Sequence, residues 1–163
     1  MSADVALQLR IERCERVLSL TQPWAWCIVS MPGLWKNVEN RKPGFSHKSF
    51  RGDFFVHAAK RCRPEDYRGA VTWIAARFGV GAPRCIPPLA SLPLGGIVGM
   101  SRVTDIVAPS PEPRMQWHMS DQYGFVLDDR VALPFVECRG HLGFFMAKDL
   151  LRDRIVRQLR MTP

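Results

Sequence analysis

The sequence predicts a single α+β domain built on a small, mostly antiparallel β-barrel with two to four flanking helices. A length of 163 residues is typical of one domain, and a hydrophobic content of 47% suffices for a core. Short runs of alternating residues bounded by Pro and Gly indicate five or six strands, and helical spacing recurs between them. We expect the domain to span residues 1–163, with its core at about 17–147 and a basic helix at 148–160.

The first part of the chain predicts two strands and a buried helix. In order we expect a strand at 16–21, an apolar helix at 24–30, an extended segment at 35–41, a loop at 42–50 and a central strand at 53–58. Pro23 suits the first turn of the helix. An extended chain at 35–41 would place Glu39 and Arg41 on one side and Lys36 on the other.

The second part predicts one long helix and most of the strands. The expected elements are a helix at 64–78, loops at 81–93 and 108–120, strands at 96–106, 123–127, 131–138 and 140–146, and a helix from 148. The first of these helices has Glu65 and Asp66 in its first turn and Gly79 at its end. Asp128-Asp129-Arg130 predicts a turn that joins the strands on either side as an antiparallel pair.

Positive charge is concentrated in one third of the chain. The formal net charge is +8, and residues 36–84 carry eleven basic and four acidic side chains. The flanking segments are close to neutral. Such a concentration is typical of a surface that meets phosphates, so the sequence favours RNA or single-stranded DNA as a partner.

Several classes of protein are disfavoured. The five cysteines and four histidines lack the spacings of a structural metal site, and neither a G-x-G-x-x-G nor a G-x-x-x-x-G-K-[ST] motif is present. The longest uncharged stretch, 85–101, is interrupted by Pro and Gly, so we expect no membrane partner. Residues 1–15 have no apolar segment of the kind found in secretory signals, which favours a cytoplasmic location.

Three segments follow one another in an order typical of one family. They are LSLTQPWA at 18–25, KNVENR at 36–41, and RG at 51–52 followed by FFVHA at 54–58. Together with the segments at 95–99, 123–127 and 140–145, they resemble the ASCH domain family, whose fold is similar to the PUA RNA-binding barrel. The resemblance runs from about Val17 to Ala147.

The resemblance implies a pocket between the short helix and the strands that begin near Lys36 and Arg51, suited to a nucleotide, a modified nucleoside or a short single strand. The residues expected at this site are Gln22, Trp24, Lys36, Arg41, Arg51, His57 and Tyr123. Their chemistry agrees, because Lys and Arg side chains donate to phosphate and Trp24, Trp26 or Trp35 offers a face for a base. Glu39 would accept a hydrogen bond from an exocyclic amine or act as a general base.

Each of these residues also has a purely structural interpretation. Glu39 with Arg41 or Arg51 would form an ion pair between strands, and His57 would be a structural histidine in an apolar strand. Tyr123 either lines the pocket or packs in the core, and at least one of Trp24 and Trp26 belongs to the core. Trp117, in a Pro-rich loop, is either a lid or an exposed loop residue.

Three functional hypotheses follow. The leading one is a nucleic-acid-binding domain without a cofactor. The second is an RNA-directed hydrolase, either a ribonuclease or an amidohydrolase acting on N4-acetylcytidine, with Lys36 and Glu39 as the acid–base pair. A ribonuclease would also need a weakly held divalent metal. For the amidohydrolase, the sequence departs from the family's pattern, because that branch has a threonine where Glu39 stands. The third is a protein-interaction module in transcriptional or translational regulation.

Overall fold

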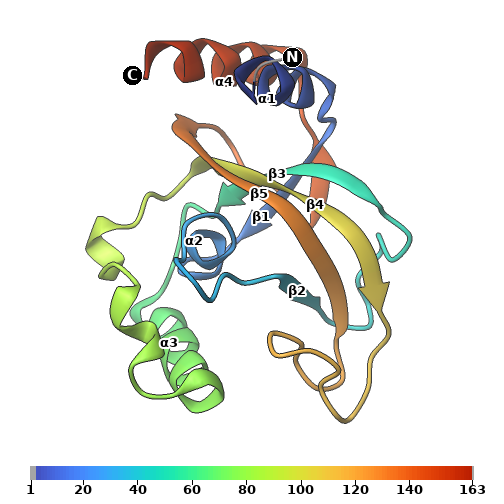
Figure 1. The fold of residues 1–163 in the computed structure, drawn as a ribbon, viewed down its shortest axis with the longest axis vertical. Helices are drawn as coiled ribbons and strands as arrows, with labels where there is room; N and C mark the ends of the chain where they lie inside the picture. Colours follow the sequence, from blue (N-terminus) through green and yellow to red (C-terminus); the bar gives the residue numbers. More distant parts are fainter. Residues whose placement is uncertain (1–2, 163) are drawn as a thin grey trace.

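Six strands form one curled sheet, a half-barrel, in the computed structural model, which describes residues 3–162 (Figure 1). Their order across the sheet is β2-β5-β4-β3-β1-β6, and every neighbouring pair is antiparallel except β1 with β3. The α+β class and the largely antiparallel sheet are therefore confirmed. The strands are β1 (Arg16–Leu20), β2 (Val38–Arg41), β3 (Gly52–Ala58), β4 (Gly96–Val107), β5 (Tyr123–Glu137) and β6 (Phe144–Met146).

Four α-helices flank the sheet in the described part of the chain. They are α1 (Ala3–Arg13), α2 (Trp24–Val29), α3 (Pro64–Phe78) and α4 (Asp149–Met161), and two 3₁₀ turns follow α3 at Ala82–Cys85 and Leu89–Ser91. The sequence predicted α2, α3 and α4 but not α1. None of the helices within residues 3–162 combines the length and apolar character that a membrane span requires.

Both faces of the sheet are covered by helices. Neighbouring residues on β3 alternate between two apolar clusters, since Phe54 packs with α2 and Phe55 packs with α1 and α4. Figure 1 shows α2 inside the curve of the sheet and α1 beside α4 against its other side. Ile11 of α1 and Ile155 of α4 are completely buried there. Burial of such side chains contributes about 1.5–3 kcal/mol each, so α1 and α4 are part of the hydrophobic core.

Gly99 in β4 allows α2 to lie directly on the sheet. A Cβ atom at this position would come within 2.5 Å of the Val29 side chain of α2 and of the Val131 carbonyl oxygen of β5. Atoms this close cannot both be accommodated without movement of the backbone. The absence of a side chain at Gly99 thus sets the depth at which α2 sits, and with it the position of the residues at the start of that helix.

The predicted turn at Asp128-Asp129-Arg130 is wrong, because β5 continues through it. The register between β4 and β5 shifts here, with Met100 opposite Val131 and Arg102 opposite Asp128, so β5 contains one extra residue. Asp129 takes up this residue with a φ of 50°. The polar run therefore forms a bulge in a long bent strand and not the end of a hairpin.

Other expectations also need correction. The strand expected from residue 35 begins at Val38, and the strand expected from 140 begins at Phe144. Trp117 is neither a lid nor an exposed residue. It is only 2% exposed, and its ring lies 4.5 Å from that of Phe78 and 5.9 Å from that of Trp73, so the Pro-rich loop packs against α3.

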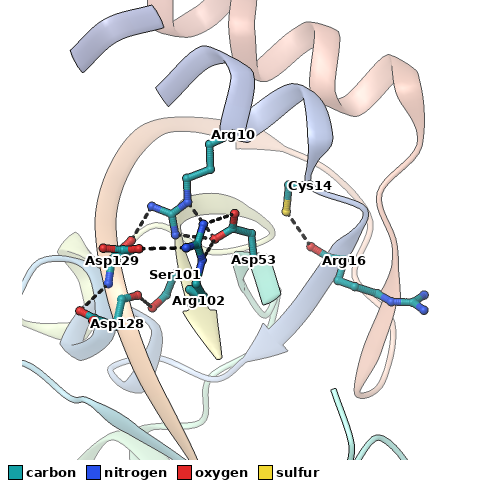
Figure 2. A network of polar contacts seen from close by, with 8 residues as sticks. All are labelled: Arg10, Cys14, Arg16, Asp53, Ser101, Arg102, Asp128 and Asp129. Atoms are coloured by element: carbon teal, nitrogen blue, oxygen red, sulfur yellow. Dashed lines mark hydrogen bonds and ion pairs between the residues drawn. The ribbon is translucent and has the colours of Figure 1, made fainter. Parts of the chain in front are cut away.

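A polar network fastens α1 to the sheet at the bulge of β5 (Figure 2). The Asp53 carboxylate of β3 accepts hydrogen bonds from Arg10 Nε of α1 at 2.8 Å and from Arg102 of β4 at 3.0 Å. Arg10 also donates to the Asp129 carbonyl oxygen at 2.6 Å, and Ser101 Oγ donates to the Asp128 carbonyl oxygen at 2.8 Å. One carboxylate thus links a helix, two strands and the bulge.

Replacing Asp53 by Asn is expected to lower the free energy of unfolding at neutral pH by about 2 kcal/mol, because charge-assisted hydrogen bonds are lost. Burial raises the pKa of the Asp53 carboxyl, but the hydrogen bonds and charges of Arg102 and Arg10 outweigh burial and hold the pKa below its ordinary 3.8. The stabilisation is therefore complete above that value and is lost as the pH falls through the folded-state pKa.

Urea unfolding of wild type and Asp53→Asn at a series of pH values measures this dependence. The difference between the two proteins should be largest near neutrality and shrink in acid. Asp105→Asn is the matched control, because Asp105 forms an ion pair with Arg51 at 3.1 Å in which its side chain is 73% exposed. We expect little change for this variant. A difference for Asp53→Asn that is independent of pH would be inconsistent with the role of the charge.

Candidate functional site

A pocket of about 420 Å³ opens where β1 ends and α2 begins. It receives residues from β1, α2, β2 and two loops that precede β5 and β6. Its lining consists of Ser19, Leu20, Thr21, Trp24, Lys36, Glu39, Asn40, Arg41, Ala59, Met119, Gln122, His141, Leu142 and Gly143. We refer to this site below as the pocket.

A buried ion pair forms one wall of the pocket. Lys36 Nζ lies 2.5 Å from Glu39 Oε2 and donates to the Val38 carbonyl oxygen at 2.6 Å. The Lys36 and Glu39 side chains are only 2% and 8% exposed. The expectation that they lie on opposite sides of a strand is wrong, because Lys36 precedes β2 and its backbone N–H donates to the Cys27 carbonyl of α2.

Aromatic and cationic groups meet above this ion pair. The Lys36 ammonium lies 5.7 Å from the centre of the Trp24 ring, which is half-buried at the start of α2. Trp24 packs edge-on against Trp73 of α3. The Trp24 ring is therefore held in place by α3 and the ammonium, while part of it lines the pocket.

Arg41 places a guanidinium group in the pocket with one donor unused. Its Nη2 lies 3.3 Å from Glu39 Oε1, and the guanidinium lies 5.1 Å from the centre of the Phe45 ring. Arg41 Nε is buried and has no hydrogen-bond partner among the described residues. Buried donors are rarely left unpaired in folded proteins, so Arg41 Nε is an exception that calls for an acceptor.

Asn40 brings a distant loop to the pocket. Its Nδ2 donates to the Trp117 carbonyl oxygen at 2.8 Å, and its Oδ1 accepts from the Met119 N–H at 2.8 Å. Both ends of the amide are thus used within the protein. Asn40 therefore positions the loop that carries Met119 and Gln122 as lining residues.

Four of the residues expected at the site lie together in the pocket: Trp24, Lys36, Glu39 and Arg41. Gln22 is buried behind the pocket, where its Oε1 accepts from the Trp26 N–H at 3.0 Å and its Nε2 donates to the Pro93 carbonyl oxygen at 3.0 Å. Gln22 thus caps the first turn of α2 and takes no part in lining the pocket.

Arg51 and Tyr123 are not among the lining residues of the pocket. Arg51 is exposed and forms its ion pair with Asp105 of β4. Tyr123 packs on the core cluster inside the sheet, with the Lys48 ammonium 5.1 Å from the centre of its ring. The structure therefore places Arg51 on an outer surface and gives Tyr123 the packing interpretation.

His57 is buried and lines a second groove next to the pocket. Its Nε2 lies 3.1 Å from the Cys138 carbonyl oxygen, and its Nδ1 lies 2.9 Å from Ser19 Oγ. Because a carbonyl can only accept, Nε2 carries the proton and Nδ1 accepts from the Ser19 hydroxyl. Burial lowers the pKa of His57, so the ring is neutral at physiological pH.

Several lining residues carry little sequence signal of their role. Met119 and Gln122 follow a Pro-rich segment, and His141, Leu142 and Gly143 lie in a region that the pattern assigned to a strand. The glycines at 140 and 143 were the one available clue, since a strand interior rarely contains two so close together. They mark a turn beside the pocket.

No group of three or more His, Cys, Asp or Glu side chains within residues 3–162 is arranged to hold a metal ion. Comparison of the sequence with models of protein families finds no match, and a search of the curated proteins finds none either.

The buried pair predicts a large effect on stability when only one charge is removed. Lys36→Met should reduce the free energy of unfolding by about 3–5 kcal/mol, because Glu39 stays buried without its ammonium partner. The double variant Lys36→Met/Glu39→Gln should recover part of this loss, since no buried carboxylate remains. Lys60→Met is the control, because the Lys60 side chain is exposed and has no ion pair or hydrogen bond with another described residue. Chemical denaturation of the four proteins measures the effect, and wild-type stability of the single Lys36 variant would refute it.

Proposed function

We propose that the protein is a nucleic-acid-binding domain of the ASCH type, which holds one nucleotide of single-stranded RNA or DNA in the pocket. The observation that carries this proposal is the combination of Trp24, Glu39 and the unpaired Arg41 donor in one cavity. A ring face, a carboxylate and a guanidinium are the three kinds of group that bind a base and its phosphate. The curled sheet agrees with the barrel that the resemblance implies.

The size and wall of the pocket suit a base. Its volume of about 420 Å³ lies within the usual range of small-molecule sites. Trp24 supplies an aromatic surface that is already fixed by Trp73 and Lys36. Stacking of a base on such a ring contributes about 1–3 kcal/mol and does not depend strongly on which base is bound.

Glu39 supplies the polar contact that orients the base. Each of its carboxylate oxygens already meets one cation, Lys36 at Oε2 and Arg41 at Oε1. A carboxylate has about four acceptor positions, so two remain for a ligand. An exocyclic amine or a ring N–H would occupy them, and the two flanking cations hold the carboxylate in one orientation.

Arg41 supplies a donor to the acceptor side of the ligand. The unused Nε points to a carbonyl oxygen of the base or to a phosphate oxygen as its partner. The Arg41 guanidinium is held by Phe45 and Glu39, so little rotamer freedom is lost when a ligand binds.

Arg41→Gln is expected to weaken binding of fluorescein-labelled, mixed-sequence single-stranded 12-mers about tenfold, since a hydrogen bond to a charged group is lost. Fluorescence anisotropy with RNA and DNA versions of the oligonucleotide measures the dissociation constants and shows which sugar is preferred. Arg51→Gln is the matched control, because it removes the same side chain from the same basic segment but outside the pocket. It should change affinity less than threefold. Equal losses for the two variants, or no binding by the wild type, would rule the proposal out.

A second candidate function, a hydrolase, is favoured by the position of the Lys36–Glu39 pair in the pocket wall. On N4-acetylcytidine, water would attack the acetyl carbon while Glu39 takes its proton. The C–N bond would then break, and Lys36 would donate a proton to the leaving amine, which gives acetate and cytidine. For a ribonuclease, the pocket offers the single carboxylate Glu39, so a divalent metal would need the substrate phosphate as a further ligand.

The hydrolase candidate predicts turnover of labelled RNA or of N4-acetylcytidine that Glu39→Gln lowers at least 100-fold in kcat, measured at saturating substrate so that weaker binding does not contribute. Assays with and without a divalent metal separate the two reactions. Circular dichroism must show that the variant is folded, because the substitution leaves Lys36 buried without its carboxylate. Absence of turnover by the wild type on both substrates would end this candidate and leave the binding function unaffected.

A further inference from the structure

A second groove of about 820 Å³ runs beside the pocket, between the end of β3 and the connection from β5 to β6. We refer to it as the basic groove. It is lined by Ser19, His57, Ala59, Lys60, Arg61, Leu94, Gly95, Glu137, Cys138, Arg139, Gly140, His141 and Leu142.

Three unpaired cations give the basic groove its charge. Lys60 and Arg61 follow β3 and Arg139 follows β5, and all three are exposed. None of them forms an ion pair or a side-chain hydrogen bond with another described residue, and Glu137 is the one carboxylate among the lining residues. By contrast, the next arginine along the chain, Arg63, is bound by Asp66 at 2.9 Å.

The basic groove and the pocket lie next to each other. They share Ser19, Ala59, His141 and Leu142 as lining residues. A ligand whose base occupies the pocket would therefore have the basic groove immediately beside it. The side chains that line both sites separate the pocket from the basic groove.

Gly140 allows the backbone to lie directly on the His57 ring in the lining of the basic groove. A Cβ atom there would overlap the His57 ring and come within 3.1 Å of Ser19 Oγ. The groups below it are polar but uncharged, because His57 is neutral and bonded to Ser19. The positive charge of the basic groove therefore lies on its rim, on long side chains that can follow a strand of phosphates.

We propose that the basic groove is a phosphate-binding subsite for the nucleic acid whose nucleotide occupies the pocket, with Lys60, Arg61 and Arg139 as the phosphate ligands. This inference rests on the proposed function and specifies its substrate class. The ligand is a phosphorylated nucleotide or an oligonucleotide, and a free nucleoside occupies only half of the site. Lys pairs with a phosphate as a point charge and Arg as a planar fork, and neither contact reads the base, so this contribution depends on charge and not on base identity.

The test compares two triple variants with the same change of charge. The groove variant is Lys60→Gln/Arg61→Gln/Arg139→Gln. The control variant is Arg84→Gln/Arg114→Gln/Lys148→Gln, three exposed residues outside the pocket and the basic groove that are likewise unpaired in the described structure. Dissociation constants for the single-stranded 12-mer are measured over a range of salt concentrations. Each phosphate contact contributes about 0.7 to the slope of log K against log salt.

We expect the groove variant to lose at least tenfold in affinity and to show a slope smaller by about 1.4–2.1, while the control variant stays within threefold of wild type. Titration with the four ribonucleoside 5′-monophosphates, each alone, identifies the source of the phosphate. Weaker monophosphate binding assigns the subsite to the nucleotide's own phosphate, and a loss confined to the 12-mer assigns it to neighbouring phosphates of the strand. Equal affinities and slopes for the two triple variants would overturn the inference.

This outcome is distinguishable from failure of the proposed function. If the groove variant binds as tightly as the control variant while Arg41→Gln still weakens binding, the pocket is correct and the phosphate subsite is wrong. If the wild type does not bind the 12-mer at all, both proposals fall.

Discussion

The curled sheet has to be covered on both faces, and this constraint decides where the polar groups of the domain lie. On β3, Phe54 and Val56 face α2, whereas Asp53, Phe55 and His57 face the other way. The polar residues on this second face of β3, Asp53 and His57, lie near the two ends of the strand. Asp53 ties down α1, and His57 reaches the basic groove. Apolar contacts occupy the middle of the sheet, so the candidate site has to form where the strands end.

At the end of the sheet where the pocket lies, burial requires every charged group to have a partner. One atom of the pocket, Arg41 Nε, departs from this rule. The Lys36 ammonium is removed from water and is compensated by Glu39 and the Val38 carbonyl. Asn40 uses both ends of its amide to hold the loop at Trp117. Arg41 Nε alone is left without an acceptor in the described residues of this site. In a preorganised binding site, the supporting groups have their hydrogen-bond partners within the protein and a donor is left for the ligand. The pocket has this arrangement.

Local signals in the sequence were sufficient for elements whose ends are marked by special residues, and insufficient where tertiary contacts decide. Pro64 and Gly79 enclose α3, and its predicted bounds are those observed. Asp129 is equally suited to a turn or a bulge, and only the register with β4 distinguishes them. Trp117 is buried because α3, distant in sequence, packs against it. Lys36 reaches Glu39 because it precedes the strand, which no alternation rule could show.

Tertiary contacts also decide which charges a ligand can meet, because many basic side chains counted in the sequence are paired or buried in the fold. Residues 36–84 hold eleven basic side chains, and the sequence treats them as one patch. In the fold, Arg51, Arg63 and Arg68 are bound by carboxylates, and Lys36 is buried against Glu39. The cations of the basic groove, which have no partner among the described residues, come from two separate parts of the chain, Lys60 and Arg61 after β3 and Arg139 after β5. Since Arg139 lies outside the basic segment, the basic groove could be located only once the fold had brought the ends of β3 and β5 to the same end of the sheet.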